Sequence, residues 1–279
     1  MIYLLLAIAC SALFSIIMRF SEGKVRANIS MLAANYLACV LMAGAYMGFS
    51  NILPAVDGIG GAVGMGAFNG LLYPLGFALI QYNIKKNGVV LTATFMKLGL
   101  LVPMVVSICF FREVPALFQI IGFCLAIAAI LLINSEKETG AVEFKVGLLV
   151  LLLLANGGSD SMSKVFEELG NNALSDQFLF FTFFTAFLLG VIFVLYKKER
   201  PGMVDIFYGL LVGVPNYLSA RFLLKALEHM PAVIAYPTFS VASLVVITLA
   251  GVCFFRERLS RRQWIAVAAI LVALALLNI

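Results

Sequence analysis

The sequence predicts an all-α integral membrane protein with ten transmembrane helices, arranged as two inverted five-helix repeats. Two observations predict it: the chain is apolar along its whole length, and one stretch of it occurs twice. Of the 279 residues, 63% are hydrophobic and 12% are charged, and the mean hydropathy is +1.08. Soluble domains carry roughly 45–50% apolar and 25% charged residues. This composition therefore indicates a chain whose solvent is lipid.

The duplicated stretch covers residues 105–134 and 249–278. The pentapeptide Cys-Phe-Phe-Arg-Glu at 109–113 returns unchanged at 253–257, an offset of 144 residues. Shared hydrophobicity would explain matching apolar positions, but it would not align an Arg-Glu pair, a glutamine (119 and 263) and an asparagine (134 and 278) in one register. We therefore interpret the chain as two repeats, residues 1–140 and residues 141–279.

Each repeat contains five apolar segments long enough to cross a bilayer, which takes about 20 residues in a helix. The predicted spans are 2–20, 29–49, 58–82, 88–111, 114–134, 145–167, 176–196, 203–227, 232–255 and 261–279. Five is an odd number, so the second repeat must enter the membrane from the side opposite to the first. This inverted construction is common among secondary transporters.

Several classes of function are excluded by what the sequence contains. The basic residues behind the net charge of +5 lie in short turns between apolar segments, where membrane topology explains them and a nucleic-acid partner does not. The five cysteines lie in apolar segments and are predicted to be small buried hydrophobic residues, with neither disulfide nor metal spacing. No ATP-binding loop of the form GxxxxGK[ST] is present, and no cofactor or metal is predicted.

Lys97 is the first candidate for a substrate-binding residue. It lies nine residues into the predicted span 88–111, about 13 Å deep at 1.5 Å per residue. A cation inside the membrane costs roughly 2.5–3.5 kcal/mol, so it should face the protein interior or a watery cavity. The alternatives are a gating or substrate-facing lysine, which would favour an anionic group on the solute, and a lysine that snorkels or pairs for structural reasons.

The stretch Asn156-Gly157-Gly158-Ser159-Asp160-Ser161 supplies the second candidates, Asn156 and Asp160. Two glycines inside a helix predict a kink or an unwound turn, which discontinuous transporter helices have at their binding sites. Asp160 is expected to pair with Lys97 or with Lys164 one turn on, or to carry a coupling proton. Alternatively, the sixth span begins earlier and Asp160 lies near the membrane surface.

A matched polar face is predicted on the third and eighth spans. Tyr73 and Tyr217 are again 144 residues apart, Asn69 precedes Tyr73 by one turn, and Asn216 adjoins Tyr217. Such side chains supply hydrogen bonds without the cost of a buried charge. They would line a cavity between the repeats, or else join helices by hydrogen bonds for packing. Arg221, one turn beyond Tyr217, is expected to snorkel outward.

Other residues are predicted to be structural. Four glycines of the third span form two pairs at a spacing of four, Gly60/Gly64 and Gly66/Gly70, and indicate close helix packing. Glu113 and Glu257 are expected to bind neighbouring helix ends and nearby arginines. His229, the only histidine, is expected to be a solvated turn residue.

The two repeated hairpins, FFREVPALFQIIGFCLAIAAILLIN and FFRERLSRRQWIAVAAILVALALLN, resemble the EamA-like members of the drug/metabolite transporter superfamily. Gly122 fits the family pattern, which places a glycine three residues after the glutamine, whereas Ala266 departs from it. The resemblance implies ten helices in two halves and a central cavity through which small metabolites or drugs are exported or exchanged. It implies no particular substrate, because the recognisable motif is structural.

The resulting functional prediction is a multi-pass plasma-membrane transporter, not an enzyme. It would export or exchange a small polar solute such as an amino acid by alternating access, coupled to a proton or another ion. The alternatives are an exporter of cationic drugs, an intramembrane enzyme, and a channel. Orientation stays open: the odd-numbered turns and their flanks hold fourteen basic residues and the even-numbered ones four, which places both termini outside, whereas relatives usually keep both in the cytoplasm.

Overall fold

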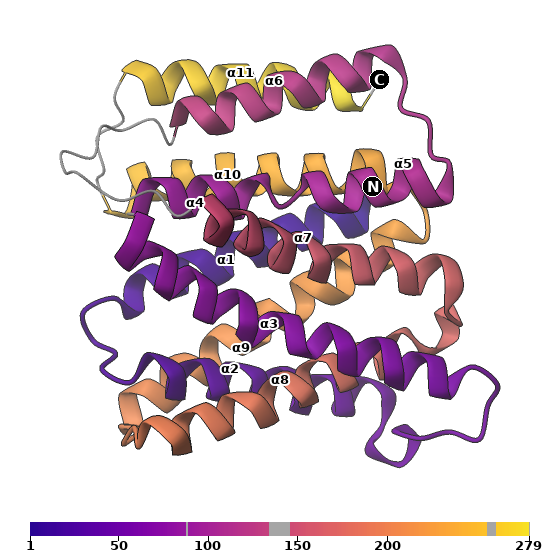
Figure 1. Cartoon of the computed structure of the whole chain (residues 1–279), viewed down its shortest axis with the longest axis vertical. Helices are drawn as coiled ribbons and strands as arrows, with labels where there is room; N and C mark the ends of the chain where they lie inside the picture. Colours follow the sequence, from indigo (N-terminus) through magenta and orange to yellow (C-terminus); the bar gives the residue numbers. More distant parts are fainter. Residues whose placement is uncertain (88, 134–145, 256–260, 279) are drawn as a thin grey trace. The chain divides into compact units, whose positions relative to one another are not determined.

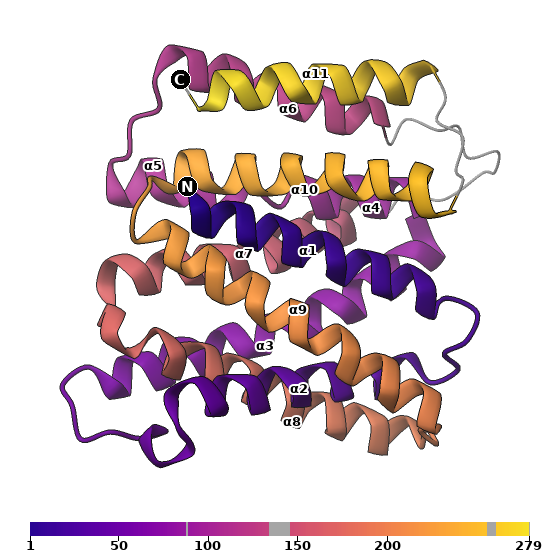
Figure 2. The same ribbon diagram turned by 180° about the vertical axis from the view of Figure 1, so that it is seen from behind.

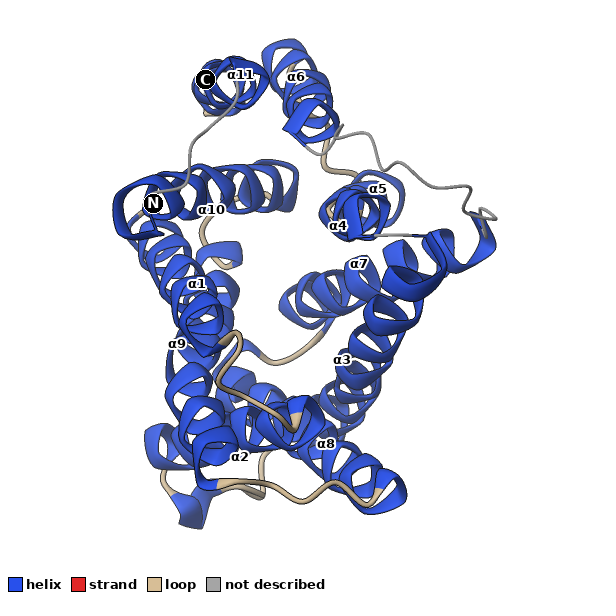
Figure 3. Cartoon of the chain, turned by 90° about the vertical axis from the view of Figure 1, so that its left-hand side faces the viewer, coloured by secondary structure: helices blue, strands red, loops and turns tan. Residues whose placement is uncertain are grey.

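The computed structural model describes residues 1–87, 89–133, 146–255 and 261–278, and every regular element in these ranges is a helix (Figures 1 and 3). The α-helices are α1 (Ile2–Ser21), α2 (Asn28–Met47), α3 (Ile59–Asn87), α4 (Val89–Leu98), α5 (Leu101–Phe111), α6 (Leu117–Ile133), α7 (Val146–Leu169), α8 (Ser175–Lys197), α9 (Met203–Leu227), α10 (Ala232–Phe255) and α11 (Arg261–Leu277). Two short 3₁₀ helices, η1 (Phe49–Asn51) and η2 (Asn172–Leu174), precede α3 and α8.

The predicted spans are confirmed as helices, with one correction. The fourth span is two helices, α4 and α5, interrupted at Gly99 and Leu100. Seven of the described helices are long and apolar enough to cross a membrane, and the three remaining spans are represented by shorter apolar helices. The chain is therefore a multi-pass integral membrane protein. That its two halves are inverted repeats stays a prediction.

The described chain forms two compact units, and each unit combines segments from both halves of the sequence. Unit 1 comprises residues Met1–Pro74 and Val165–Glu228, and unit 2 comprises Leu75–Lys164 and His229–Ile279. The predicted boundary near residue 140 concerns duplication rather than packing, and it stays a prediction.

Unit 1 is built around α2, which packs against both α8 and α9, while α9 also packs against α1 (Figure 2). Its core is rich in aromatic rings, and Phe166, Phe178, Phe183 and Tyr217 are fully buried. Glycine allows the backbones to approach. A Cβ atom on Gly213 of α9 would lie 2.5 Å from the Ala38 Cβ atom of α2.

The predicted glycine contacts of α3 are confirmed for one pair only. A Cβ atom on Gly66 would lie 2.6 Å from the carbonyl oxygen of Phe178, and one on Gly70 would lie 2.6 Å from the Cβ atom of Thr185, so both glycines pack against α8. Within the part of the chain that the structure describes, nothing lies within 4 Å of a Cβ atom placed on Gly60 or Gly64. The close packing predicted for Gly60 and Gly64 is wrong, because no described backbone approaches this part of α3.

Unit 2 has an aliphatic core. Helix α11 packs against α6 and α10, and α5 packs against α10. Buried alanines such as Ala126 and Ala273 let these helices lie close together, and Ile130 and Ile270 fill the core between them.

Carboxylates hold several helix ends in place. In unit 1, Glu199 accepts hydrogen bonds from the backbone N–H and the hydroxyl of Ser30 in the first turn of α2, both at 3.0 Å. Asp205 in the first turn of α9 accepts from the backbone N–H groups of Gly202 and Arg26, both at 2.8 Å. The first N–H groups of a helix lack partners within the helix, so a carboxylate there satisfies them.

Candidate functional site

In unit 2, Lys97 occupies the last turn of α4, directly before the break at Gly99 and Leu100. Its side chain is half-buried. The interruption has a local cause, because α7 passes close by: a Cβ atom on Gly99 would lie 3.3 Å from the backbone nitrogen of Gly157. Lys97 thus lies within the predicted span, and α4 ends one residue beyond it, at Leu98.

Asn156 and Asp160 lie one turn apart on α7. Asp160 is nine residues from the end of this helix, about 13 Å at 1.5 Å per residue. It therefore lies well inside this helix, and its depth relative to the membrane surface stays a prediction. The side chain is exposed. A carboxylate deep in a span would be costly against lipid, so it is expected to face protein or water.

The unwound turn predicted at Gly157 and Gly158 is wrong, because α7 runs unbroken from Val146 to Leu169. Gly157 serves close packing instead. A Cβ atom there would lie 2.5 Å from the Cγ2 atom of Val102 and would also meet the carbonyl oxygen of Gly99. The discontinuity therefore belongs to the partner helices α4 and α5.

Two lysines were proposed as partners of Asp160. Lys97 lies close enough for its charge to act on that of Asp160. Lys164 forms an ion pair with Glu113, with 3.0 Å between Nζ and Oε1. That Asp160 pairs with Lys97 stays a prediction. Glu113 also accepts hydrogen bonds from the backbone N–H groups of Ala232 and Val233 at the start of α10. The predicted helix-end role of Glu113 is confirmed, with Lys164 as its cation. Glu257 lies outside the described residues.

Tyr236 of α10 was missed by the sequence reasoning. It is 2% exposed, and its hydroxyl donates a hydrogen bond to the backbone carbonyl of Asp160. The contact holds α10 against α7 at the level of the acidic side chain. The signal available in the sequence was a tyrosine inside an apolar span. The duplication did not single it out, because the residue at the same place in the first repeat is Thr92.

The remaining candidates lie in unit 1, on two sides of one phenylalanine. The rings of Tyr73 and Tyr217 each pack edge-on against Phe183, with centroids 5.6 Å and 6.2 Å away. Asn216 donates a hydrogen bond to the Asn35 side chain at 3.1 Å. Asn69 is buried on α3, one turn before Tyr73. That these four residues and the unit 2 group line one cavity stays a prediction.

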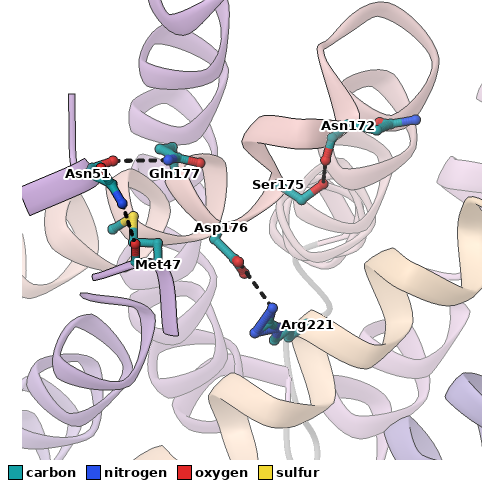
Figure 4. Close-up of polar contacts among 7 residues, drawn as sticks. All are labelled: Met47, Asn51, Asn172, Ser175, Asp176, Gln177 and Arg221. Carbon is teal, nitrogen blue, oxygen red and sulfur yellow. Dashed lines mark hydrogen bonds and ion pairs between the residues drawn. The ribbon is translucent and has the colours of Figure 1, made fainter. Parts of the chain in front are cut away.

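Arg221 does not snorkel outward as predicted. Its guanidinium donates to the Asp176 carboxylate at 3.0 Å (Figure 4). It also lies over the Tyr46 ring, with the carbon Cζ 4.1 Å from the centroid. The side chain is 13% exposed. The acidic partner at the start of α8 and the aromatic face draw the cation inward, and neither is visible from the sequence around Arg221.

The predictions for the cysteines and for the histidine had different outcomes. All five cysteines are free, but only Cys39 is buried, and Cys109, Cys124 and Cys253 are exposed. The prediction of burial is wrong for these three, because the helices that carry them present an apolar surface outward. His229 lies in an exposed turn as predicted. Within the described ranges, no three side chains of the metal-binding types gather into a cluster.

The chain is similar to known proteins along most of its length. A protein of Haemophilus influenzae, described only as uncharacterized, is 23% identical over 276 residues, which is 95% of this chain and 93% of that protein. A probable 4-amino-4-deoxy-L-arabinose-phosphoundecaprenol flippase subunit, ArnE, of Hamiltonella defensa is 35% identical over 55 residues, 20% of this chain and 49% of that protein.

The fold also has a solved counterpart. A crystal structure with 14% sequence identity matches 99% of this chain and 94% of its own, with a TM-score of 0.75. The model of the EamA-like transporter family matches residues 1–135 and again residues 144–279. On these matches, the chain belongs to the EamA-like transporter family, and it is a membrane transporter of the drug/metabolite superfamily.

Proposed function

We propose that this transporter exports or exchanges a small polar organic solute, such as an amino acid, by alternating access. The observation that carries the proposal is the pair of opposite charges inside the membrane spans of unit 2. Lys97 is half-buried at the end of α4, Asp160 is exposed well inside α7, and their charges interact. Ionisable groups at such depth typically mark the path of a substrate or an ion.

The two charges match the two ends of a zwitterion. The ammonium group of Lys97 would bind the carboxylate of the solute, and Asp160 would bind its amino group. Asn156, one turn before Asp160 on α7, adds an amide to the same side of that helix. When the solute leaves, the two side chains neutralise each other, so neither charge stays uncompensated in the empty protein.

Coupling to a proton fits the same geometry. A proton on Asp160 would leave Lys97 without its counter-ion, which would favour an anionic group of the solute in its place. Proton movement and solute binding would then be linked through one pair of side chains. Because the chain carries no ATP-binding loop, an ion or solute gradient is the proposed source of energy.

Lys97→Met and Asp160→Asn test the proposal in proteoliposomes. The measurement is counter-flow of labelled amino acids, with the thermal midpoint of the purified protein recorded across amino acids, sugar phosphates, nucleotides and lipophilic cations. Each variant should weaken binding of the zwitterion about ten- to a hundred-fold, the usual value of one charged hydrogen bond. Lys197→Met, at the exposed end of α8, is the matched control and should bind like the wild type.

Three outcomes would contradict the proposal. A cationic ligand that binds through Asp160 and survives Lys97→Met would indicate the alternative, an exporter of cationic compounds. Flux that rises linearly with the gradient and shows no counter-flow would indicate a channel. Chemical conversion of the solute by the purified protein would indicate an intramembrane enzyme.

A further inference from the structure

A second polar site lies in unit 1, between the start of α8 and the last two turns of α9. It is a pocket of about 210 Å³. Pockets for drug-sized ligands run from roughly 300 to 1,000 Å³. The pocket therefore suits a small solute or a single headgroup.

Charges of both signs line this pocket. Arg221, Lys225 and Glu228 lie on one face of α9 and beyond its end, at spacings of four and three residues. Asp176 faces them from the first turn of α8, beside the hydroxyl group of Ser175. Two positive and two negative side chains leave no net formal charge. A ligand with a single charge gains little from such a lining, whereas a ligand with both charges can meet each sign.

Arg221 is held in place and still has donors to spare. Asp176 accepts a hydrogen bond from its Nη2 atom at 3.0 Å (Figure 4). The Tyr46 ring lies against the guanidinium, 4.1 Å from Cζ to the centroid. Its Nη1 atom is buried and has no hydrogen-bond partner in the part of the chain that the structure describes. A guanidinium carries five N–H donors, and leaving a buried one unused is costly. Arg221 lines the pocket, and its fixed orientation means that a ligand oxygen could bind the guanidinium N–H groups that face the pocket with little loss of conformational entropy.

The apolar part of the lining sets the remaining selectivity. Leu179 and Leu224 are each 2% exposed and contribute apolar surface to the pocket. They favour a short carbon chain between the two charged ends of the ligand.

We propose that this pocket binds a small zwitterion, with its anionic oxygens on Arg221 and Lys225 and its ammonium group on Glu228. Two sources supply that chemistry: a free amino acid or phosphoethanolamine, and the headgroup of a zwitterionic phospholipid. Both can reach the site, because α9 has 25 residues and spans about 37 Å at 1.5 Å per residue. It is thus longer than the ~30 Å hydrocarbon core. The inference concerns a site other than the Lys97 and Asp160 pair and does not rest on the proposed transport reaction.

The test measures ligand binding to variants of the full chain. Lys225→Met keeps an apolar side chain of similar length and removes the Nζ atom, which lies 5.7 Å from the centroid of the Tyr3 ring. Glu228→Gln alters an exposed side chain, so both variants should fold. The matched controls are Lys197→Met and Glu22→Gln. Both residues are exposed and lie at the C-terminal ends of α8 and α1, whereas the pocket lies at the start of α8. The ligands in detergent are L-alanine, O-phosphoethanolamine, alaninamide as the cation alone and propionate as the anion alone. Nanodiscs of phosphatidylethanolamine and of phosphatidylglycerol test the lipid source.

We expect a zwitterion to bind at least tenfold more tightly than either single-charge analogue. Lys225→Met and Glu228→Gln should each weaken that binding about ten- to a hundred-fold, while the two controls should not. A free zwitterion that does this identifies a soluble ligand. Stabilisation by phosphatidylethanolamine alone, lost in the same two variants, identifies a headgroup.

Equal binding of alaninamide or propionate would overturn the inference, as would an equal loss in the controls or no binding in any arm. Lys97→Met separates the two proposals. Zwitterion binding that Lys97→Met abolishes and both pocket variants retain would refute this pocket and leave the proposed transport site intact. The opposite pattern would establish the pocket and count against the role of Lys97.

Discussion

Replacing Glu113 with glutamine should lower the free energy of unfolding by about 3–5 kcal/mol, the usual cost of removing one partner of a buried ion pair. Lys164 is 3% exposed and Glu113 13% exposed, so the variant would remove the carboxylate that binds this charged, buried lysine at 3.0 Å. Glutamine has nearly the same size and keeps one oxygen for the first N–H groups of α10. The variant therefore isolates the loss of charge. The measurement is the thermal midpoint and the denaturant dependence of the protein in detergent.

The double variant Glu113→Gln/Lys164→Met is the control. Replacing a whole buried ion pair with groups of similar volume is often neutral, so the double variant should recover most of the stability. If the double variant is as unstable as Glu113→Gln alone, the hydrogen bonds to α10 rather than the charge account for the loss. If Glu113→Gln changes stability by less than about 0.5 kcal/mol, the ion pair is not a stabilising element.

Gly70→Ala should lower the free energy of unfolding by about 1–3 kcal/mol, the range for overpacking a close contact. The added Cβ atom would lie 2.6 Å from the Thr185 Cβ atom and would also meet the carbonyl oxygen of Thr182. Because backbone cannot move aside as a side-chain tip can, α3 and α8 would have to separate. Thermal unfolding in detergent measures the loss.

Gly64→Ala is the matched control on the same helix. No described atom lies within 4 Å of the position of its new Cβ atom, so the expected change is in helix propensity, up to about 1 kcal/mol in favour of alanine. The two substitutions are chemically identical and six residues apart, and the difference between them measures the contact with α8. Equal effects of the two variants would refute the packing role of Gly70.

The helices could be predicted from the sequence because a membrane span is recognised locally. The ranges 203–227 and 232–255 coincide with α9 and α10, and most other ends differ by one to three residues. The length of a span is set by the thickness of the hydrocarbon core, and its composition by the cost of polar groups in lipid. Neither quantity depends on which helix lies next to it. The break at Gly99 was not predictable in this way, because it accompanies the close approach of α7.

Part of the candidate site could also be predicted from the free-energy cost of placing a charge in lipid. Because charged residues inside apolar spans are costly, Lys97 and Asp160 could be identified from the sequence. The contact partners of the charged residues could not. Lys164 could have paired with Asp160 by spacing along the helix, but it pairs with Glu113, which is 51 positions away in the chain. Arg221 turns toward Asp176, 45 positions away, and Tyr236 bonds the backbone beside Asp160.

The sequence by itself determined that this protein crosses the membrane many times, where its helices begin and end, and which of their residues are too polar to face lipid. Tertiary structure decided which glycines touch a backbone, which lysine meets which carboxylate, and where Arg221 points. The physical reason is that the solvent around the spans is lipid. Spans that are apolar on every side carry little periodic pattern to show which face meets a neighbour. Those choices rest on contacts between segments distant in the chain, which become visible only once the helices have packed.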